Sequence, residues 1–381
     1  MLTENDTSGS APWPRAGRIP SLDGLRAVAV ALVLFAHVHQ TAGLPRVRFF
    51  DVVGSHAAIG VEIFFVISGF LITTLMLREL GRENAVNISA FYQRRVLRIV
   101  PAYACLLVVI AIMNGSGFVH LRRADWLAAL TYTVNFLPHP NWNIGHAWSL
   151  SIEEHFYLIW PLVLARGGIA FARRAALGAI AFCFVMRWAV LLFAPRHSAE
   201  AELWTFTRLD TIAFGCLLAV VACDPVWRQR LGRLCSSNRI VGLAGLGLVG
   251  SVFLSSFSAK FAVGVAYTAN SALIALLLWS AVERSGSRVG RWLNHPAVAF
   301  VGVGSYSLYL WQQIFLNRGS HAFVCTFPQN LLFACVAAWV SYRFIERPFL
   351  SLKGRISAGR GAARSRGQAH PAAAQASPAS P

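Results

Sequence analysis

The sequence predicts an all-α integral membrane protein with about ten transmembrane helices and one re-entrant or interfacial segment. Of the 381 residues, 56% are hydrophobic and 13% are charged, whereas about a quarter of a soluble domain is charged. Apolar stretches long enough to cross a bilayer recur along the whole chain. Most Lys and Arg residues fall in the loops between them, so the net charge of +18 indicates membrane topology and anionic headgroups, not nucleic-acid binding.

Ten apolar stretches are candidates for membrane spans. They cover residues 23–43, 56–77, 96–113, 149–165, 175–194, 205–222, 239–257, 262–282, 296–317 and 329–345. Basic loops follow every second span. Because loops rich in Lys and Arg stay on the cytoplasmic side, we expect a multi-pass membrane protein with both termini in the cytoplasm.

A further apolar stretch, Trp126 to Leu137, is too short to span and is followed by Pro138 and Pro140. We expect it to be re-entrant or interfacial and to line a cavity, because unpaired backbone cannot face lipid. Residues 1–17 and the basic tail 351–381 have compositions typical of disorder. Residues 18–350 then form the membrane domain.

Arg26 and His37 lie eleven residues apart in the first apolar stretch. Eleven residues make about three helical turns, so both side chains share one helix face, roughly 16 Å apart along the axis. A cation and an imidazole are both costly inside a membrane, which makes functional use the better explanation. His37 is a candidate general base, and a hydrogen-bonded packing histidine is the alternative. Asp23 is placed to pair with Arg26.

Arg95 and Arg98 lie one turn apart at the inner end of the third span. Guanidinium groups suit phosphate geometry, so the two could bind a phosphorylated ligand. Contact with lipid headgroups is an equally good explanation of arginines in this position.

The segment from His146 to Pro161 carries acidic residues at the outer end of an apolar span. Ser149 and Glu153 share a helix face, and adjacent carboxylates in apolar surroundings favour a functional site over a helix start stabilised by the helix dipole. Trp148 lies beside them.

Three further charged positions enter spans from the outer side. Glu62 could reach the depth of His37, and Arg208 and Asp210 could form a structural ion pair or bind an acceptor. Arg187 is isolated within a span and has no evident partner in the sequence.

Six segments in order resemble the acyltransferase 3 family of membrane acyltransferases, which includes O-acyltransferases of bacterial glycans and macrolide sugars. The matching segments are Ser21–Ala27 with His37, Gly60–Phe70, Phe91–Pro101, Trp148–Tyr157, Ser305–Trp311 and Glu346–Pro348. Many family members have Asp where this chain has Glu62, and Gln where it has His155. Larger members carry a fused extracytoplasmic domain, so we expect this chain to be of the stand-alone type.

The resemblance implies transfer of an acyl group, most simply acetyl, from cytoplasmic acyl-CoA to a hydroxyl of a glycan, a lipid-linked sugar or a glycosylated small molecule. It assigns acyl-CoA binding to Arg26, Arg95 and Arg98, and catalysis to His37, Ser149, Glu153 and Glu62. We expect Arg208, Asp210 and Trp148 to bind the acceptor. His37 either deprotonates the acceptor or carries the acyl group transiently. No metal or bound cofactor is expected, and the other partners are membrane lipids.

The main alternative is a transporter or flippase that moves a polar substrate without chemistry, because charges on several spans also suit a substrate pathway. The chain shows no repeated halves, which disfavours it. A structural scaffold would leave Arg26, His37 and Glu153 unexplained.

Overall fold

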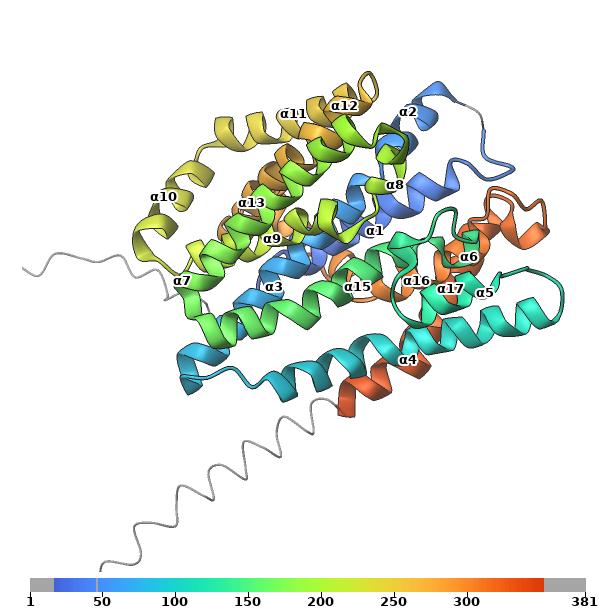
Figure 1. The fold of residues 1–381 in the computed structure, drawn as a ribbon, viewed down its shortest axis with the longest axis horizontal. Helices are drawn as coiled ribbons and strands as arrows, with labels where there is room; N and C mark the ends of the chain where they lie inside the picture. The colour runs from blue at the N-terminus through green and yellow to red at the C-terminus, as the bar shows by residue number, and fades with distance from the viewer. Residues whose placement is uncertain (1–16, 46, 353–381) are drawn as a thin grey trace, which may run out of the picture.

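The computed structural model describes residues 17–45 and 47–352, and every regular element in these residues is a helix (Figure 1). The α-helices are α1 (Leu22–Val38), α2 (Arg48–His56), α3 (Ile59–Glu83), α4 (Ile88–Gly115), α5 (Arg123–Leu130), α6 (Trp142–Gly145), α7 (Ala147–Phe193), α8 (Ser198–Ala201), α9 (Thr205–Val221), α10 (Pro225–Ser236), α11 (Asn238–Ser255), α12 (Ala259–Phe261), α13 (Tyr267–Glu283), α14 (Arg288–Leu293), α15 (Pro296–Val303), α16 (Ser305–Phe315) and α17 (Gln329–Ser341). Short 3-10 or π turns are η1 (Val134–Phe136), η2 (Pro195–His197), η3 (Ala262–Ala266), η4 (Phe323–Cys325) and η5 (Tyr342–Glu346). Of the segments predicted to be disordered, 1–17 and 351–381, residues 1–16 and 353–381 lie outside the described part, and residues 351–352 are helical.

Five helices in the described residues are long and apolar enough to cross a membrane, or six if one bent pair is a single span. They are Phe50–Glu83, Ile88–Gly115, Trp142–Phe193, Asn238–Ser255 and Ala259–Glu283, and the bent pair is Pro195–Ala201 with Thr205–Val221. These helices support a membrane protein. The predicted number of about ten spans is not confirmed, since helices such as α1 with 17 residues and α17 with 13 residues are shorter.

Helix α7 contains two of the predicted spans and the basic loop between them. It has 47 residues, so without a bend it would be about 70 Å long, more than twice the hydrocarbon thickness. Gly168 interrupts it with a φ of 66° and a ψ of −172°, a conformation that side chains other than hydrogen disfavour. The helix therefore forms two arms at an angle (Figure 1).

The apolar stretch from Trp126 to Leu137 forms α5 and η1, neither of which is long enough to span a membrane. Asp125 anchors it by accepting hydrogen bonds from Arg122 Nε at 2.9 Å and from the Asn141 backbone nitrogen at 3.0 Å. The hydrogen bond from the Arg122 guanidinium holds the pKa of the Asp125 carboxyl below its usual range. The carboxylate thus ties α5 to the start of α6.

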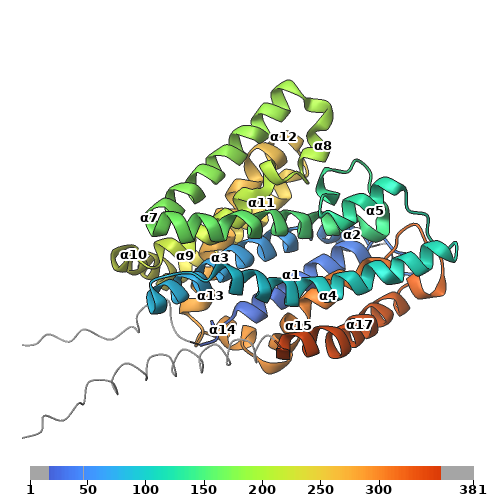
Figure 2. The same cartoon turned by 60° about the horizontal axis from the view of Figure 1, so that its bottom comes forward.

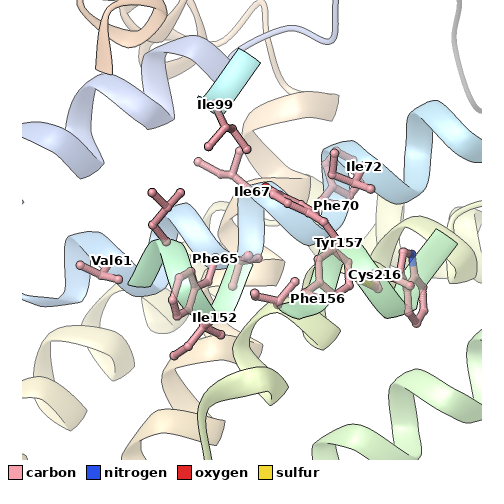
Figure 3. Close-up of a cluster of buried hydrophobic side chains, with 14 of the residues drawn as sticks. Val61, Phe65, Ile67, Phe70, Ile72, Ile99, Ile152, Phe156, Tyr157 and Cys216 are labelled. Carbon is pink, nitrogen blue, oxygen red and sulfur yellow. The ribbon is translucent and has the colours of Figure 1, made fainter. Parts of the chain in front are cut away.

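The centre of the bundle is formed by α1 and α3, with α7 on one side and α15 and α17 on the other (Figure 2). Side chains of α3 and α7 pack together with side chains of α4 and α9 in the core (Figure 3). The labelled members are Val61, Phe65, Ile67, Phe70 and Ile72 of α3, Ile99 of α4, Ile152, Phe156 and Tyr157 of α7, and Cys216 of α9. This packing fixes the face that α3 presents to its neighbours.

Two glycines allow α3 and α9 to cross in close contact. A Cβ atom on Gly69 would overlap the Ile212 carbonyl, and a Cβ atom on Gly215 would overlap the Val66 carbonyl. Small residues at a helix crossing let the backbones approach closely, which is how membrane helices gain packing energy without a hydrophobic driving force. In the sequence, the small-residue run Ser68-Gly69 indicates close helix packing, and the structure shows this packing.

We predict that Gly69→Ala destabilises the protein by about 1–3 kcal/mol, because the added methyl group has to displace the Ile212 carbonyl of α9. Gly81→Ala on the same helix is the matched control, since a Cβ atom there meets nothing within 4 Å and alanine favours a helix. Thermal unfolding in detergent measures both variants. Equal unfolding temperatures for Gly69→Ala and the wild type would contradict the close crossing.

Candidate functional site

A cavity lies between α1, α3, α4, α7 and α16. Its empty volume is about 890 Å³, which includes the part of the cavity that is open to solvent. Its polar lining residues are Arg26, Ser68, Arg95, Arg98, His146, Ser149, Glu153, Tyr157, Ser305, Tyr306 and Tyr309. Its apolar lining residues are Val61, Phe64, Phe65, Ile67, Leu71, Ile72, Ala147, Leu150 and Leu310. A concave cavity that combines apolar walls with polar groups is the usual form of a small-molecule site.

Three arginines predicted to bind acyl-CoA converge on this cavity. Arg26 comes from α1, and Arg95 and Arg98 come from α4. Among the described residues only Arg26 has a carboxylate partner, Asp23 Oδ1 at 3.1 Å. Arg95 and Arg98 form no ion pair within the described part of the chain, so this end of the cavity carries an excess of positive charge that suits an anionic ligand.

Glu153 lies at the arginine end of the cavity. Arg95 stacks over the ring of Tyr157 at 4.6 Å from its centroid, and Tyr157 shares a hydrogen bond of 2.6 Å with Ser68. The groups close enough to act on Glu153 include Ser68, Tyr157, Arg95 and Arg26. No hydrogen bond joins Glu153 and His37 in the described structure, and the role that the family resemblance suggests for Glu153, orienting this imidazole, stays a prediction.

The opposite end of the cavity is formed by the start of α7 and by α16. The Ser149 hydroxyl contacts the Tyr309 hydroxyl at 2.5 Å and donates to the His146 carbonyl at 3.3 Å. His146 is 3% exposed, and its ring stands edge-on to Tyr309 with 5.6 Å between the ring centroids. Ser149 therefore belongs to a polar group that also includes Tyr309 and His146, and its predicted catalytic role stays a prediction.

His37 lies next to this end but is not a lining residue of the cavity. Its ring stands edge-on to Trp142, with 5.7 Å between centroids, and its Nδ1 is buried without a hydrogen-bond partner in the described structure. Gln312 approaches the ring without a well-formed hydrogen bond. His37 and His146 are close enough for their charges to interact.

Glu62 and Arg208 lie on the other side of α3, away from the cavity. Both are buried, and Arg208 Nη2 lies 3.7 Å from Glu62 Oε1. The Arg208 guanidinium also stacks over Tyr267 at 3.7 Å from the ring centroid. Glu62 therefore has a buried cationic partner of its own, and its predicted catalytic role stays a prediction.

Arg187, for which the sequence offered no partner, is fully buried and pairs with Asp210 Oδ2 at 2.8 Å. It also donates to the Thr207 carbonyl at 2.5 Å. Arg208 and Asp210 thus pair with separate partners, Glu62 and Arg187, and the suggested ion pair between the two of them is wrong. An assignment to acceptor binding stays a prediction for both.

Trp148, the third residue expected to bind acceptor, packs edge-on against Phe65 at 6.0 Å between ring centroids. It does not line the cavity, although its neighbours on both sides do.

Sequence reasoning passed over His146, Tyr157 and Tyr309 as site residues. A signal for the first two was present, because His146, Ser149, Glu153 and Tyr157 follow one another at helical spacing on one face. Tyr309 comes from a segment far along the chain, and only the tertiary structure places it beside Ser149.

Comparison with known proteins identifies the family. Residues 19–343 match the acyltransferase domain of the acyltransferase 3 family. The chain belongs to the acyltransferase 3 family. The resemblance seen in the six sequence segments is thereby confirmed.

Two curated relatives of this acyltransferase 3 protein come from Staphylococcus aureus. One is a protein of strain COL that is provisionally named an O-acetyltransferase. It is 26% identical to this chain over 380 residues, which cover 91% of this chain and 59% of the relative. The O-acetyltransferase OatA of strain NCTC 8325 is 27% identical over 375 residues, which cover 87% of this chain and 57% of OatA. The chain thus spans less than two thirds of the length of these relatives. No solved structure matches it significantly.

We predict that Asp210→Asn destabilises this acyltransferase 3 protein by roughly 3–5 kcal/mol, because it leaves the Arg187 charge buried and unpaired. The double variant Arg187→Met, Asp210→Leu removes both charges and should recover part of this loss. Thermal unfolding in detergent compares the variants. If Asp210→Asn unfolds like the wild type but changes the KM for an acceptor, the residue binds acceptor and the structural role is wrong.

Proposed function

We propose that the protein is a membrane O-acyltransferase that moves an acyl group, most simply acetyl, from cytoplasmic acyl-CoA to a hydroxyl of a glycan or glycosylated acceptor. The observation that carries this proposal is one cavity with free arginines at one end and a buried histidine at the other. Membership of the acyltransferase 3 family supports it against a transporter or flippase. The names of the relatives support acetyl as the acyl group.

Arg26, Arg95 and Arg98 are suited to the phosphates of the donor. Planar guanidinium groups bind phosphate oxygens in pairs, and such charge-assisted bonds are strong where water is scarce. Tyr157, under Arg95, and His146 are eleven residues apart on one run of helix, which corresponds to about 16 Å along the axis. An extended pantetheine arm has a comparable reach, so the acyl group of a donor bound at the arginines would lie near the histidines.

The transfer itself exchanges a thioester for an ester. The acceptor oxygen forms a bond to the acyl carbon, the carbon–sulfur bond breaks, and the hydroxyl proton passes through the imidazole of His37 to the departing CoA thiolate. Transient acylation of His37 is the alternative order of events. Glu153 then balances the charge of Arg26 and Arg95 at the donor end, a role that its neighbours support.

The acceptor would approach from the outer side, where the predicted topology exposes the ends of α1, α6 and α16. In this proposal the protein lies in the inner membrane of a bacterium, surrounded by lipids, and both of its termini are in the cytoplasm. A sugar hydroxyl on a secreted or lipid-linked glycan fits the acetylating relatives best.

We predict that Arg95→Ala and Arg98→Ala each raise the KM for acetyl-CoA about ten- to a hundredfold, because each removes a charged contact to phosphate worth roughly 1.5–3 kcal/mol. Arg94→Ala is the matched control, since Arg94 bonds Glu79 at 3.1 Å and does not line the cavity. Transfer from labelled acetyl-CoA in inverted membrane vesicles gives the KM. An unchanged KM in both variants would place the donor elsewhere.

We predict that His37→Ala lowers kcat by roughly 10²–10⁴-fold while the protein still inserts in the membrane, because it removes the proposed proton acceptor. The measurement is acyl transfer from labelled acetyl-CoA, with the amount of inserted protein determined in the same membranes. Acyl transfer at the wild-type rate would exclude His37 as base and as acyl carrier.

A further inference from the structure

His146 has a buried side chain whose polar atoms are unused. It is 3% exposed and lines the cavity. The Gln313 side chain and the Leu310 backbone approach its ring, but neither Nδ1 nor Nε2 forms a well-formed hydrogen bond among the described residues. Buried polar atoms are nearly always hydrogen-bonded, since leaving them unpaired is costly. An imidazole on the cavity lining without a well-formed hydrogen bond is therefore suited to a partner that the protein itself does not provide.

The structural contacts of residue 146 come from its backbone. Its nitrogen donates to Gln313 Oε1 at 2.8 Å, and its carbonyl accepts from the Tyr309 hydroxyl at 2.9 Å. Any residue at this position could make both bonds. The side chain adds an edge-on contact to the Tyr309 ring, which a phenylalanine would also make. The packing thus requires a ring but gives no reason for an imidazole.

The position of His146 is at the reacting end of the cavity. It lies just before α7, eleven residues from Tyr157, the residue of α7 over which Arg95 of α4 stacks. Among the described residues it is the histidine that lines the cavity. His37 lies close to it, outside the lining. If His37 accepts the proton of the acceptor, a neutral His146 beside it still has one N–H group to donate.

We propose that His146 is a further catalytic residue of the acyl transfer and donates a hydrogen bond from its ring N–H to the carbonyl oxygen of the thioester. As the acceptor oxygen bonds to the acyl carbon, negative charge develops on that carbonyl oxygen, and the His146 N–H stabilises it. The charge returns when the carbon–sulfur bond breaks and the CoA thiolate leaves with the proton held by His37. Donors placed in advance at such an oxygen are among the largest catalytic contributions known.

This inference rests on the proposed function, and two substitutions test it. His146→Phe keeps the ring and the backbone bonds but has no donor, whereas His146→Gln keeps an N–H donor. We expect His146→Phe to lower kcat about 10²–10³-fold with an unchanged KM for acetyl-CoA. We expect His146→Gln to recover at least tenfold of that loss. His155→Phe is the matched control, because His155 lies on the same helix, bonds Thr205 Oγ1 at 2.7 Å and does not line the cavity.

The assay follows carbon-14-labelled acetyl-CoA in inverted membrane vesicles and counts both the label transferred to glycan and the CoA thiol released. No transfer by the wild type would refute the proposed function itself. Transfer by the wild type and undiminished transfer by His146→Phe would refute only the role of His146. His146→Gln no more active than His146→Phe would refute hydrogen-bond donation. If His146→Phe does not insert, His146→Met, which also lacks a donor, takes its place.

Discussion

Charged side chains on apolar helices need a partner or a polar cavity, because hydrocarbon does not solvate them. In this protein the two solutions are separated by α3. On one side, Arg187 pairs with Asp210 and Arg208 with Glu62, all buried. On the other side, Arg95 and Arg98 line the cavity with no carboxylate partner in the described chain. The cations that could bind an anionic ligand are those that the packing leaves unpaired.

The crossing of α3 with α9 determines which residues fall on which side. The glycine contacts at Gly69 and Gly215 hold the two backbones together, so that Ser68 faces the cavity while Glu62 faces Arg208. Residues 61 and 62 are neighbours in the chain, yet Val61 lines the cavity and Glu62 does not. The lining of the cavity and a structural ion network therefore share one helix.

The cavity also separates two kinds of chemistry along its length. The guanidinium groups lie at one end with Glu153, Tyr157 and Ser68, and His146 lies at the other end with Ser149 and Tyr309. A donor molecule with a charged head and a long neutral arm matches this order. The proposed roles of His37 as base and His146 as hydrogen-bond donor divide the work of transfer between two adjacent histidines, only one of which needs to change its charge.

The sequence by itself determined the helical class, the helix in every predicted apolar stretch, the family, and the arginines that line one end of the cavity, because these follow from hydropathy, from 3.6-residue spacing and from motifs local in the chain. Spacing could not show that Glu153 lies with Arg26 and Arg95, or that Arg187 meets Asp210. Those pairings depend on how helices far apart in sequence cross. The proposed role of His146 became visible only with the packing of α16 against α7, which satisfies its backbone and leaves its ring nitrogens without a well-formed hydrogen bond.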